Sequence, residues 1–138
     1  AEGCVFCEYA SGRGGREILF EDEVVSVFRS RDPVAATHLL VIPKQHVGNV
    51  STLGSSHAEL VRHMEAVGRE ALSMHHHAGG GRVFGFHRPP FNSVEHLHLH
   101  CIGLPWKSVF QPVRFQSHTP WFVPVGFLLR RLLEEGKE

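Results

Sequence analysis

The chain has 138 residues, of which 42% are hydrophobic and 20% charged, a composition typical of one globular domain over residues 1–138. Its 14 Lys and Arg residues balance its 14 Asp and Glu residues, which argues against electrostatic binding to duplex DNA or to an anionic membrane. No apolar run approaches about 18 residues and no signal sequence is recognised, so we expect a soluble protein of the cytoplasm, with the nucleus as a second compartment. Three cysteines and 12 histidines favour metal binding or histidine chemistry over a disulfide scaffold.

The predicted elements follow one another in the order β-β-β-α-β-β-α. Strands are predicted over 17–29 (a hairpin), 38–42, 82–86 and 95–102, and helices over 56–76 and from Pro124 onward. This order predicts an α+β domain with a five-stranded antiparallel sheet, one main helix and a short C-terminal helix. The run His75-His76-His77 precedes three glycines, and we expect it to be a solvated loop rather than a metal site.

The strongest signal is three histidines at alternate positions, His96, His98 and His100, within the predicted strand 95–102. Side chains of a strand alternate between its two faces, so the three imidazoles share one face. The apolar residues between them share the other, and among these Cys101 is interpreted as a small buried hydrophobe. Histidines that merely decorate an exposed strand are the alternative, and they would not explain the further histidines that flank strand 38–42.

The segment 96–102 resembles the His-φ-His-φ-His-φ-φ signature of the histidine triad superfamily. The similarity extends to residues 18–22, 37–46 and 85–93, and it covers residues 4–135. Within the superfamily the chain resembles the Hint branch, above all the third mammalian paralogue and its plant relatives, and aprataxin more distantly. The resemblance implies a histidine triad fold, usually homodimeric, and hydrolysis of AMP conjugates.

The resemblance also implies roles for four histidines. His98 would attack the α-phosphorus of an adenosine 5′-phosphoramidate, an acyl-adenylate or adenylyl sulfate, which gives a covalent adenylyl-histidine. A neutral imidazole is a competent nucleophile near pH 7, and the adduct divides one displacement into two easier ones. His96 and His100 would flank it, His100 as a hydrogen-bond donor to the phosphate oxygens. His38 would hydrogen-bond into the triad; the alternative is a histidine that is simply satisfied at the start of a strand.

The same resemblance implies contacts to the nucleotide. The candidate residues are Ile18, Leu19, Phe28, Ser30, Asp32, His87, Asn92 and Ser93. Phe28 and Leu19 would contact the base, although each could instead be core, and Ser93 could be a plain turn residue. Where the family carries an acid for the ribose hydroxyls this chain has Ser30, and Asp32 is the nearest substitute.

The pair Cys4-x-x-Cys7 is half of a zinc site by its spacing. The resemblance supplies His46 and His96 as the other half, and a closed Cys₂His₂ set implies one structural Zn²⁺ per chain. The alternative is two reduced, unligated cysteines in a mobile terminus.

Three other functions compete with this interpretation. His96, His98 and His100 could bind one catalytic zinc in a metallohydrolase. The chain could also be a nucleotide-binding scaffold with little turnover. Deadenylation of DNA ends is disfavoured because the chain has no net positive charge.

Overall fold

The computed structural model describes residues 3–136 and contains one antiparallel sheet in the order β1-β2-β3-β5-β4-β6. The strands are β1 (Phe20–Glu21), β2 (Val25–Arg29), β3 (Ala35–Pro43), β4 (Arg82–His87), β5 (Leu99–Trp106) and β6 (Phe122–Pro124). The helices are α1 (Val5–Ala10), α2 (Ala58–His75) and α3 (Val125–Glu135), with 3₁₀ turns at Val50–Thr52, Ser55–His57 and Pro112–Phe115. The predicted α+β class is confirmed. No helix in this described range has the length and apolarity needed to cross a bilayer.

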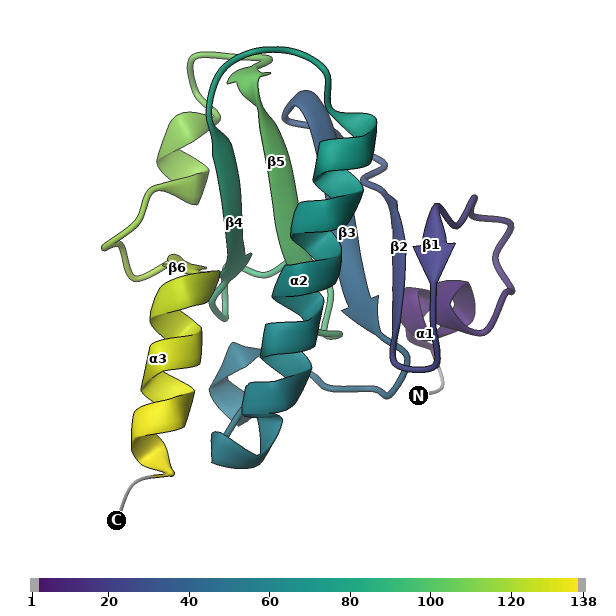
Figure 1. The fold of residues 1–138 in the computed structure, drawn as a ribbon, viewed down its shortest axis with the longest axis vertical. Coiled ribbons are helices and arrows are strands. Elements are labelled where there is room, and N and C mark those ends of the chain that lie inside the picture. Colours follow the sequence, from purple (N-terminus) through teal and green to yellow (C-terminus); the bar gives the residue numbers. More distant parts are fainter. Residues whose placement is uncertain (1–2, 137–138) are drawn as a thin grey trace.

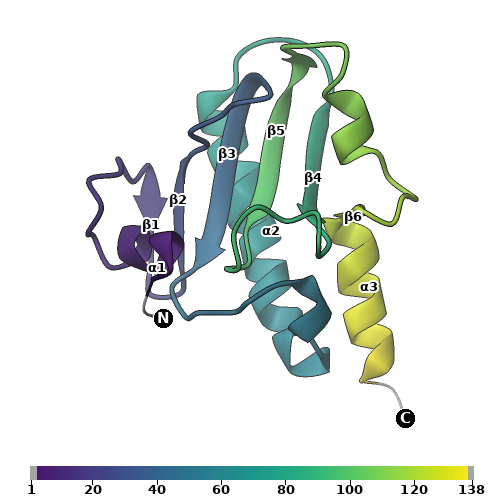
Figure 2. The same ribbon diagram turned by 180° about the vertical axis from the view of Figure 1, so that it is seen from behind.

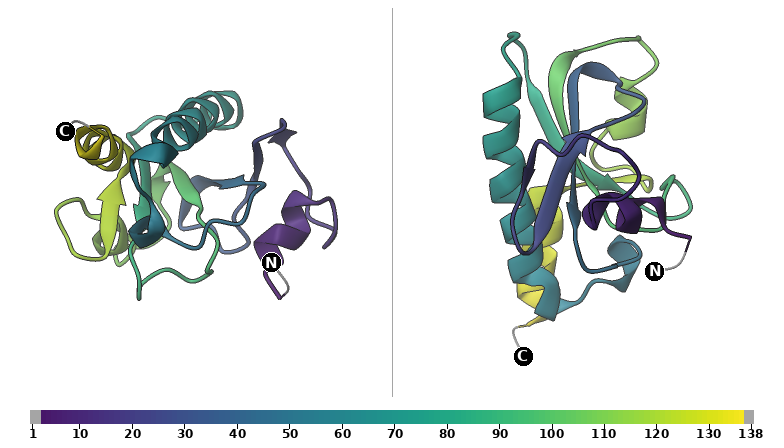
Figure 3. Two further views of the ribbon diagram at one scale, coloured as in Figure 1. Left: turned by 90° about the horizontal axis from the view of Figure 1, so that it is seen from below. Right: turned by 90° about the vertical axis from the view of Figure 1, so that its right-hand side faces the viewer.

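The helices cover the two faces of the sheet unequally. Helix α2 crosses one face with α3 beside it (Figure 1), and the short α1 lies on the opposite face (Figure 2). The right-hand view of Figure 3 shows the sheet between α2 and α1. The larger core lies under α2, where Leu99 and Cys101 of β5 pack with Val61 and Met64. Because this face supplies most of the apolar burial that stabilises the fold, polar groups can occupy the other face.

The strand predicted over 95–102 is wrong at its beginning, because β5 starts at Leu99. The ladder with β3 ends at the pair Val41–Leu99, and Pro43 has no N–H to extend it. Residues 93–96 form bends and residues 97–98 belong to no strand, although the N–H of Leu97 still donates to the carbonyl of Val47 at 2.6 Å. The triad therefore begins in a segment that has already left the ladder.

Two elements were not predicted from the sequence. Helix α1 has six residues, which is too short to show a helical repeat. Strand β6 has three residues and pairs with β4 through Phe86 and Val123, which adds a sixth strand to the five predicted.

The expectation of a solvated loop at His75-His76-His77 is wrong for the middle residue. His76 is buried, and its Nδ1 lies 2.8 Å from Thr37 Oγ1. Its ring lies against Gly103 of β5, where an added Cβ would approach to 2.4 Å. The missing side chain at Gly103 therefore admits the imidazole into the sheet face.

Gly85 of β4 allows β6 to approach closely. A Cβ at this position would lie 2.3 Å from Phe122 Cζ and 2.6 Å from the Val123 carbonyl oxygen, and the carbonyl belongs to a paired strand that cannot easily move. We expect Gly85→Ala to lower the free energy of unfolding by about 1–3 kcal/mol, as other overpacked cores do. Urea denaturation measures this difference.

Gly126→Ala is the matched control for that substitution, because its Cβ would meet no atom within 4 Å. In helix α3 an alanine should be neutral or stabilising by up to about 1 kcal/mol. Equal unfolding midpoints for the Gly85 and Gly126 variants would contradict the packing argument.

Candidate active site

The triad histidines lie on the sheet face opposite α2. His96, His98 and His100 are buried, and Leu97 and Leu99 between them belong to the core under α2. The structure therefore has the alternation that the sequence predicted. This arrangement separates the imidazoles from the main core while keeping them largely out of water.

The nucleophile candidate His98 is held in one tautomer by a backbone group. Its Nδ1 lies 2.7 Å from the carbonyl oxygen of His96. A carbonyl can only accept, so Nδ1 carries the proton and Nε2 carries the lone pair. Burial lowers the pKa of His98 to about 4 despite the opposing effect of that hydrogen bond. The imidazole is therefore neutral at pH 7, with a nucleophilic Nε2.

A second chain of hydrogen bonds fixes the opposite tautomer in His100. The N–H of Val34 donates to His38 Nδ1 at 3.2 Å, so the proton of His38 is on Nε2. His38 Nε2 then donates to His100 Nδ1 at 2.9 Å, which leaves the proton of His100 on its own Nε2. That buried N–H has no partner among the described residues. It is a donor available to a bound anion.

Both members of this relay are uncharged near neutral pH. Burial, followed by the nearby charge of Arg114, lowers the pKa of His38 to about 3. Burial also lowers the pKa of His100 well below its usual value. The ring centroids of His98 and His100 are 5.0 Å apart. A nucleophilic nitrogen and a neutral donor therefore lie side by side.

A cleft of about 440 Å³ opens beside these two histidines. Four of the predicted nucleotide contacts line it, namely Phe28, Ser30, Asp32 and Ser93. Phe28 belongs to β2, the next two follow its end, and Ser93 precedes the triad. The cleft thus joins an aromatic surface to the reactive nitrogens, as a nucleotide conjugate requires.

Two predicted contacts lie on the other side of the triad. His87 Nε2 donates to the Arg114 carbonyl at 2.8 Å, and the His87 ring lies 4.8 Å from the His100 ring. Asn92 donates to the carboxylate of Glu95. Both line a small recess shared with His98. His87 and Asn92 therefore approach His98 from the side of this recess, whereas Phe28 approaches it from the side of the cleft.

The structure does not bring Leu19 and Ile18 into the cleft. Leu19 lines a recess against Val67 and Ala71 of α2, on the opposite side of the sheet. Ile18 packs beside Phe28 but is not among the cleft-lining residues. The predicted contact of Leu19 with the base is therefore wrong, because this residue lies just before β1 and packs against the core under α2.

The sequence interpretation missed two aromatic walls of the cleft. Phe6 and Tyr9 of α1 pack against Phe28 with ring centroids 5.5 and 5.4 Å apart. Phe6 also lies edge-on to His98 at 5.1 Å. Both aromatics line the cleft. The sequence signal that could have indicated these residues is their i, i+3 spacing beside the Cys-x-x-Cys pair, which places both on one face of a short helix.

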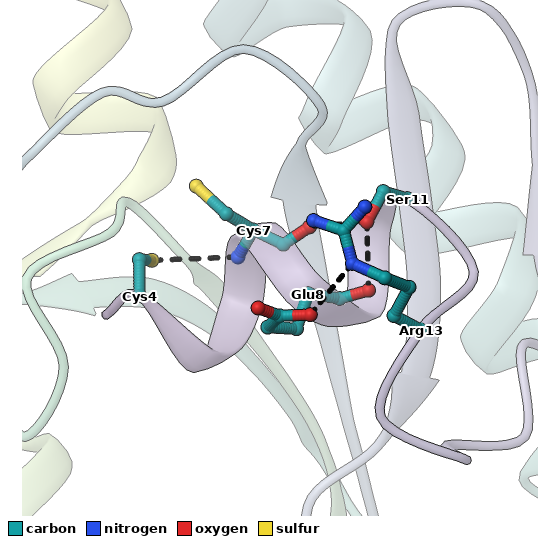
Figure 4. Close-up of polar contacts among 5 residues, drawn as sticks. All are labelled: Cys4, Cys7, Glu8, Ser11 and Arg13. Carbon is teal, nitrogen blue, oxygen red and sulfur yellow. Dashed lines mark hydrogen bonds and ion pairs between the residues drawn. The ribbon is translucent and has the colours of Figure 1, made fainter. Parts of the chain in front are cut away.

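The predicted metal ligands meet where α1 approaches the start of the triad. The donor atoms of Cys4, Cys7, His46 and His96 all lie within 4.8 Å of one another. Cys7 Sγ lies 3.2 Å from His46 Nδ1, and Cys4 Sγ lies 3.3 Å from His96 Nδ1. In Figure 4 the Cys4 sulfur also accepts the Cys7 N–H at the first turn of α1. The group could hold a metal ion.

The comparisons with known proteins agree with this geometry. A family model described as "Scavenger mRNA decapping enzyme C-term binding" matches residues 3–115. A HIT family hydrolase from Clostridium thermocellum matches with a TM-score of 0.71 and 27% identity, over 78% of this chain and 96% of that chain. The chain belongs to the histidine triad superfamily.

Other histidine triad proteins match over nearly the full length. The bifunctional adenosine 5′-phosphosulfate phosphorylase/adenylylsulfatase HINT4 of Arabidopsis thaliana is 38% identical over 135 residues, 95% of this chain and 92% of that protein. Adenosine 5′-monophosphoramidase HINT3 of Mus musculus is 38% identical over 134 residues, 94% and 81% of the two chains. A Zn-bound histidine triad family protein from Mycobacterium smegmatis matches with a TM-score of 0.61 and 28% identity, over 96% and 94%.

In this histidine triad protein the three triad histidines are not arranged to share one metal. His96 Nε2 donates to the Pro43 carbonyl at 2.8 Å, and its Nδ1 faces the two cysteines. His98 Nδ1 is likewise committed to a carbonyl. His96 therefore has no nitrogen left for an ion in the cleft. The geometry does not support the metallohydrolase alternative.

Proposed function

We propose that this chain hydrolyses AMP conjugates through a covalent adenylyl-His98 intermediate. The observation that carries the proposal is the pair of opposite tautomers: a lone pair on His98 Nε2 beside an N–H on His100 Nε2. Substrates are adenosine 5′-phosphoramidates, acyl-adenylates and adenylyl sulfate. The names of two relatives, an adenylylsulfatase and a monophosphoramidase, support this substrate class.

The reaction needs two displacements at the α-phosphorus. His98 Nε2 forms a bond to phosphorus while the bond to the leaving group breaks and its electron pair departs with that group. The adduct is an imidazolium, and its Nδ1–H faces the His96 carbonyl, which stabilises the positive charge. His100 Nε2–H donates to a non-bridging oxygen as charge develops there. Water then attacks phosphorus and breaks the new P–N bond, whose electron pair returns to His98 Nε2. This releases AMP and restores neutral His98, and the proton lost by water balances the electron pair that departed with the leaving group.

Competition between water and methanol as acceptors of the adenylyl group tests the covalent route. Wild-type protein is given adenylates with amine, acyl, sulfate and lysine leaving groups in the presence of methanol. Because every substrate passes through the same adenylyl-His98, the ratio of AMP to its methyl ester should be the same for all of them. A ratio that varies with the leaving group indicates direct attack by water. AMP binding without turnover of any adenylate indicates a nucleotide-binding scaffold.

Cys4, Cys7, His46 and His96 are proposed to bind one structural Zn²⁺. Ligand atoms placed tetrahedrally about 2.0–2.3 Å from zinc lie about 3.3–3.8 Å apart. Three sulfur–nitrogen pairs here, at 3.2, 3.3 and 3.4 Å, lie at or just below the short end of that range. His96 presents an unprotonated Nδ1 because its Nε2 donates to Pro43, a typical second contact of a metal-bound histidine. When bound, zinc would supply a fixed link between α1 and the sheet rather than a reactive water.

Ribose selectivity should be weak because Ser30 replaces an acid. A carboxylate that binds a ribose hydroxyl can reject the deoxy analogue by about 10⁴-fold in favourable cases. We expect the ratio of kcat/KM for adenosine and 2′-deoxyadenosine 5′-phosphoramidates to stay below about 100. Ser30→Asp should raise that ratio. A preference near 10⁴ in the wild type, lost in Asp32→Ala, would assign the ribose contact to Asp32 instead.

A homodimer and a location in cytoplasm and nucleus are further proposals. They rest on the resemblance to the Hint branch. Sedimentation at several protein concentrations and fractionation of cells that express the tagged chain test the two separately.

A further inference from the structure

One end of the cleft carries two arginines that the proposed reaction does not use. Arg16 and Arg31 line the cleft beside Ser30, and Asp32 is the single carboxylate among the lining residues. Within residues 3–136, neither guanidinium has a carboxylate partner within 4.0 Å. Two arginines that line one cleft without a carboxylate partner favour an anionic ligand.

Arg16 is held in place rather than free in solvent. Its Nη2 donates to the carbonyl oxygen of Arg29, and its Cζ lies 5.8 Å from the centroid of the Phe28 ring. The guanidinium is therefore fixed beside the aromatic surface of the cleft and keeps further N–H groups for a ligand. Arginine so positioned loses little side-chain entropy when it binds an anion.

The position of Ser30 identifies which part of a nucleotide these arginines meet. The N–H of Ser30 donates to the His38 carbonyl at 2.9 Å, so Ser30 lies opposite His38, one position beyond the Arg29–Leu39 pair of β2 and β3. Ser30 is also the position at which the resemblance places an acid for the ribose hydroxyls, so under the proposed function the arginines beside it would meet the ribose. Ser93 reaches the cleft from the other end of the sheet face. In Figure 2 the β2–β3 loop, which carries Ser30, and the β4–β5 segment, which carries Ser93, lie at opposite ends of that face.

We propose that Arg16, Ser30 and Arg31 bind a second phosphate, carried on the 2′- or 3′-hydroxyl of the ribose. The substrates would then be adenosine 5′-conjugates with a phosphorylated ribose, an inference that rests on the proposed function. Arginine presents a planar fork of donors that suits phosphate. The Ser30 hydroxyl accepts the Asp32 N–H at 3.3 Å and keeps its own proton to donate. An arginine near the ribose accommodates a 2′-phosphate in the same way in NADP-binding sites.

Binding of three isomeric ligands to the full chain tests this assignment without requiring turnover. Calorimetry compares AMP with adenosine 3′,5′-bisphosphate, adenosine 2′,5′-bisphosphate and ADP, the last three having equal numbers of phosphates. We expect at least one ribose-phosphorylated isomer to bind about 10-fold to 100-fold tighter than AMP, the range expected for charge-assisted hydrogen bonds. ADP should not show this gain, because its second phosphate is on the 5′ chain.

Variants assign the gain to the two arginines. Arg31→Ala and Arg16→Ala should each reduce it to less than about threefold, and Ser30→Asp should abolish it by repulsion. Arg29→Ala is the matched control: this neighbour has the same charge, but its side chain faces His75 of α2 at 3.5 Å. The gain should survive in that variant.

Equal affinities for AMP and both bisphosphates would overturn the proposal, as would a gain that persists in Arg31→Ala and Arg16→Ala or one confined to ADP. Turnover assays with AMP conjugates show whether the ribose-phosphate site or the proposed hydrolase function is at fault. Turnover of AMP conjugates without a bisphosphate gain rejects only the ribose-phosphate site. A bisphosphate gain in a protein that hydrolyses no adenylate rejects the hydrolase.

Discussion

Replacing His98 by alanine should abolish turnover of adenosine 5′-phosphoramidate while leaving AMP binding nearly intact. The substitution removes the nitrogen that forms the covalent bond, so the loss in kcat should be on the order of 10³-fold or more. Phe28 and the rest of the cleft remain, and the AMP dissociation constant should change by less than about fivefold. Steady-state kinetics and calorimetry on the same preparation give both numbers.

His77→Ala serves as the control for this experiment, because His77 is an exposed histidine just beyond α2. It should match the wild type in both measurements. A His98→Ala protein that keeps more than about a tenth of the wild-type kcat cannot use His98 as its nucleophile. Loss of AMP binding together with activity would instead indicate a collapsed cleft.

Freshly purified protein should contain one zinc ion per chain, and its removal should destabilise the fold. The proposed ligands join α1 to the end of β3 and to the start of the triad, so metal binding contributes to folding free energy. We expect chelation to lower the melting temperature by about 10 °C or more, with activity falling as structure is lost. Elemental analysis and thermal unfolding with and without chelator measure this.

Cysteine variants separate metal binding from general stability. Cys4→Ser should lose the zinc, whereas Cys101→Ala should keep one zinc per chain even though this buried thiol lies in the core under α2. Protein without zinc, or a crystal structure with metal on His98 or His100, would reject the assigned ligands and restore the metallohydrolase alternative.

The parts of the site that could be predicted from the sequence are those that depend on the pattern of residues close together in the chain. Alternation of His98 and His100 with Leu99 separates cleft from core because every strand turns successive side chains to opposite faces. The remaining ligand and nucleotide positions came from the resemblance. Leu19 was misplaced because Ile18-Leu19-Phe20 is apolar throughout, so the pattern does not say which residue faces α2.

The residues that were missed acquire their role only through tertiary contacts. Helix α1 is shorter than the roughly 12–15 residues needed for a stable isolated helix, so packing of Phe6 and Tyr9 on Phe28 must support it. Arg16 and Arg31 are loop residues in the sequence pattern. Only the packing of the α1–β1 segment against β2 brings Arg16 to the cleft that Arg31 of the β2–β3 loop also lines. No local pattern encodes these neighbours.

The two reactive histidines differ in character although they are the same amino acid two positions apart. The difference is imposed by two peptide groups: the Val34 N–H at one end of the relay and the His96 carbonyl beneath His98. One peptide makes its histidine give a proton, and the other makes its histidine give an electron pair. In the proposed mechanism the division of labour between attack and charge stabilisation thus begins at the main chain and reaches His100 through His38. Substitutions in the cleft that spare His38 can therefore change what is bound without exchanging the two roles.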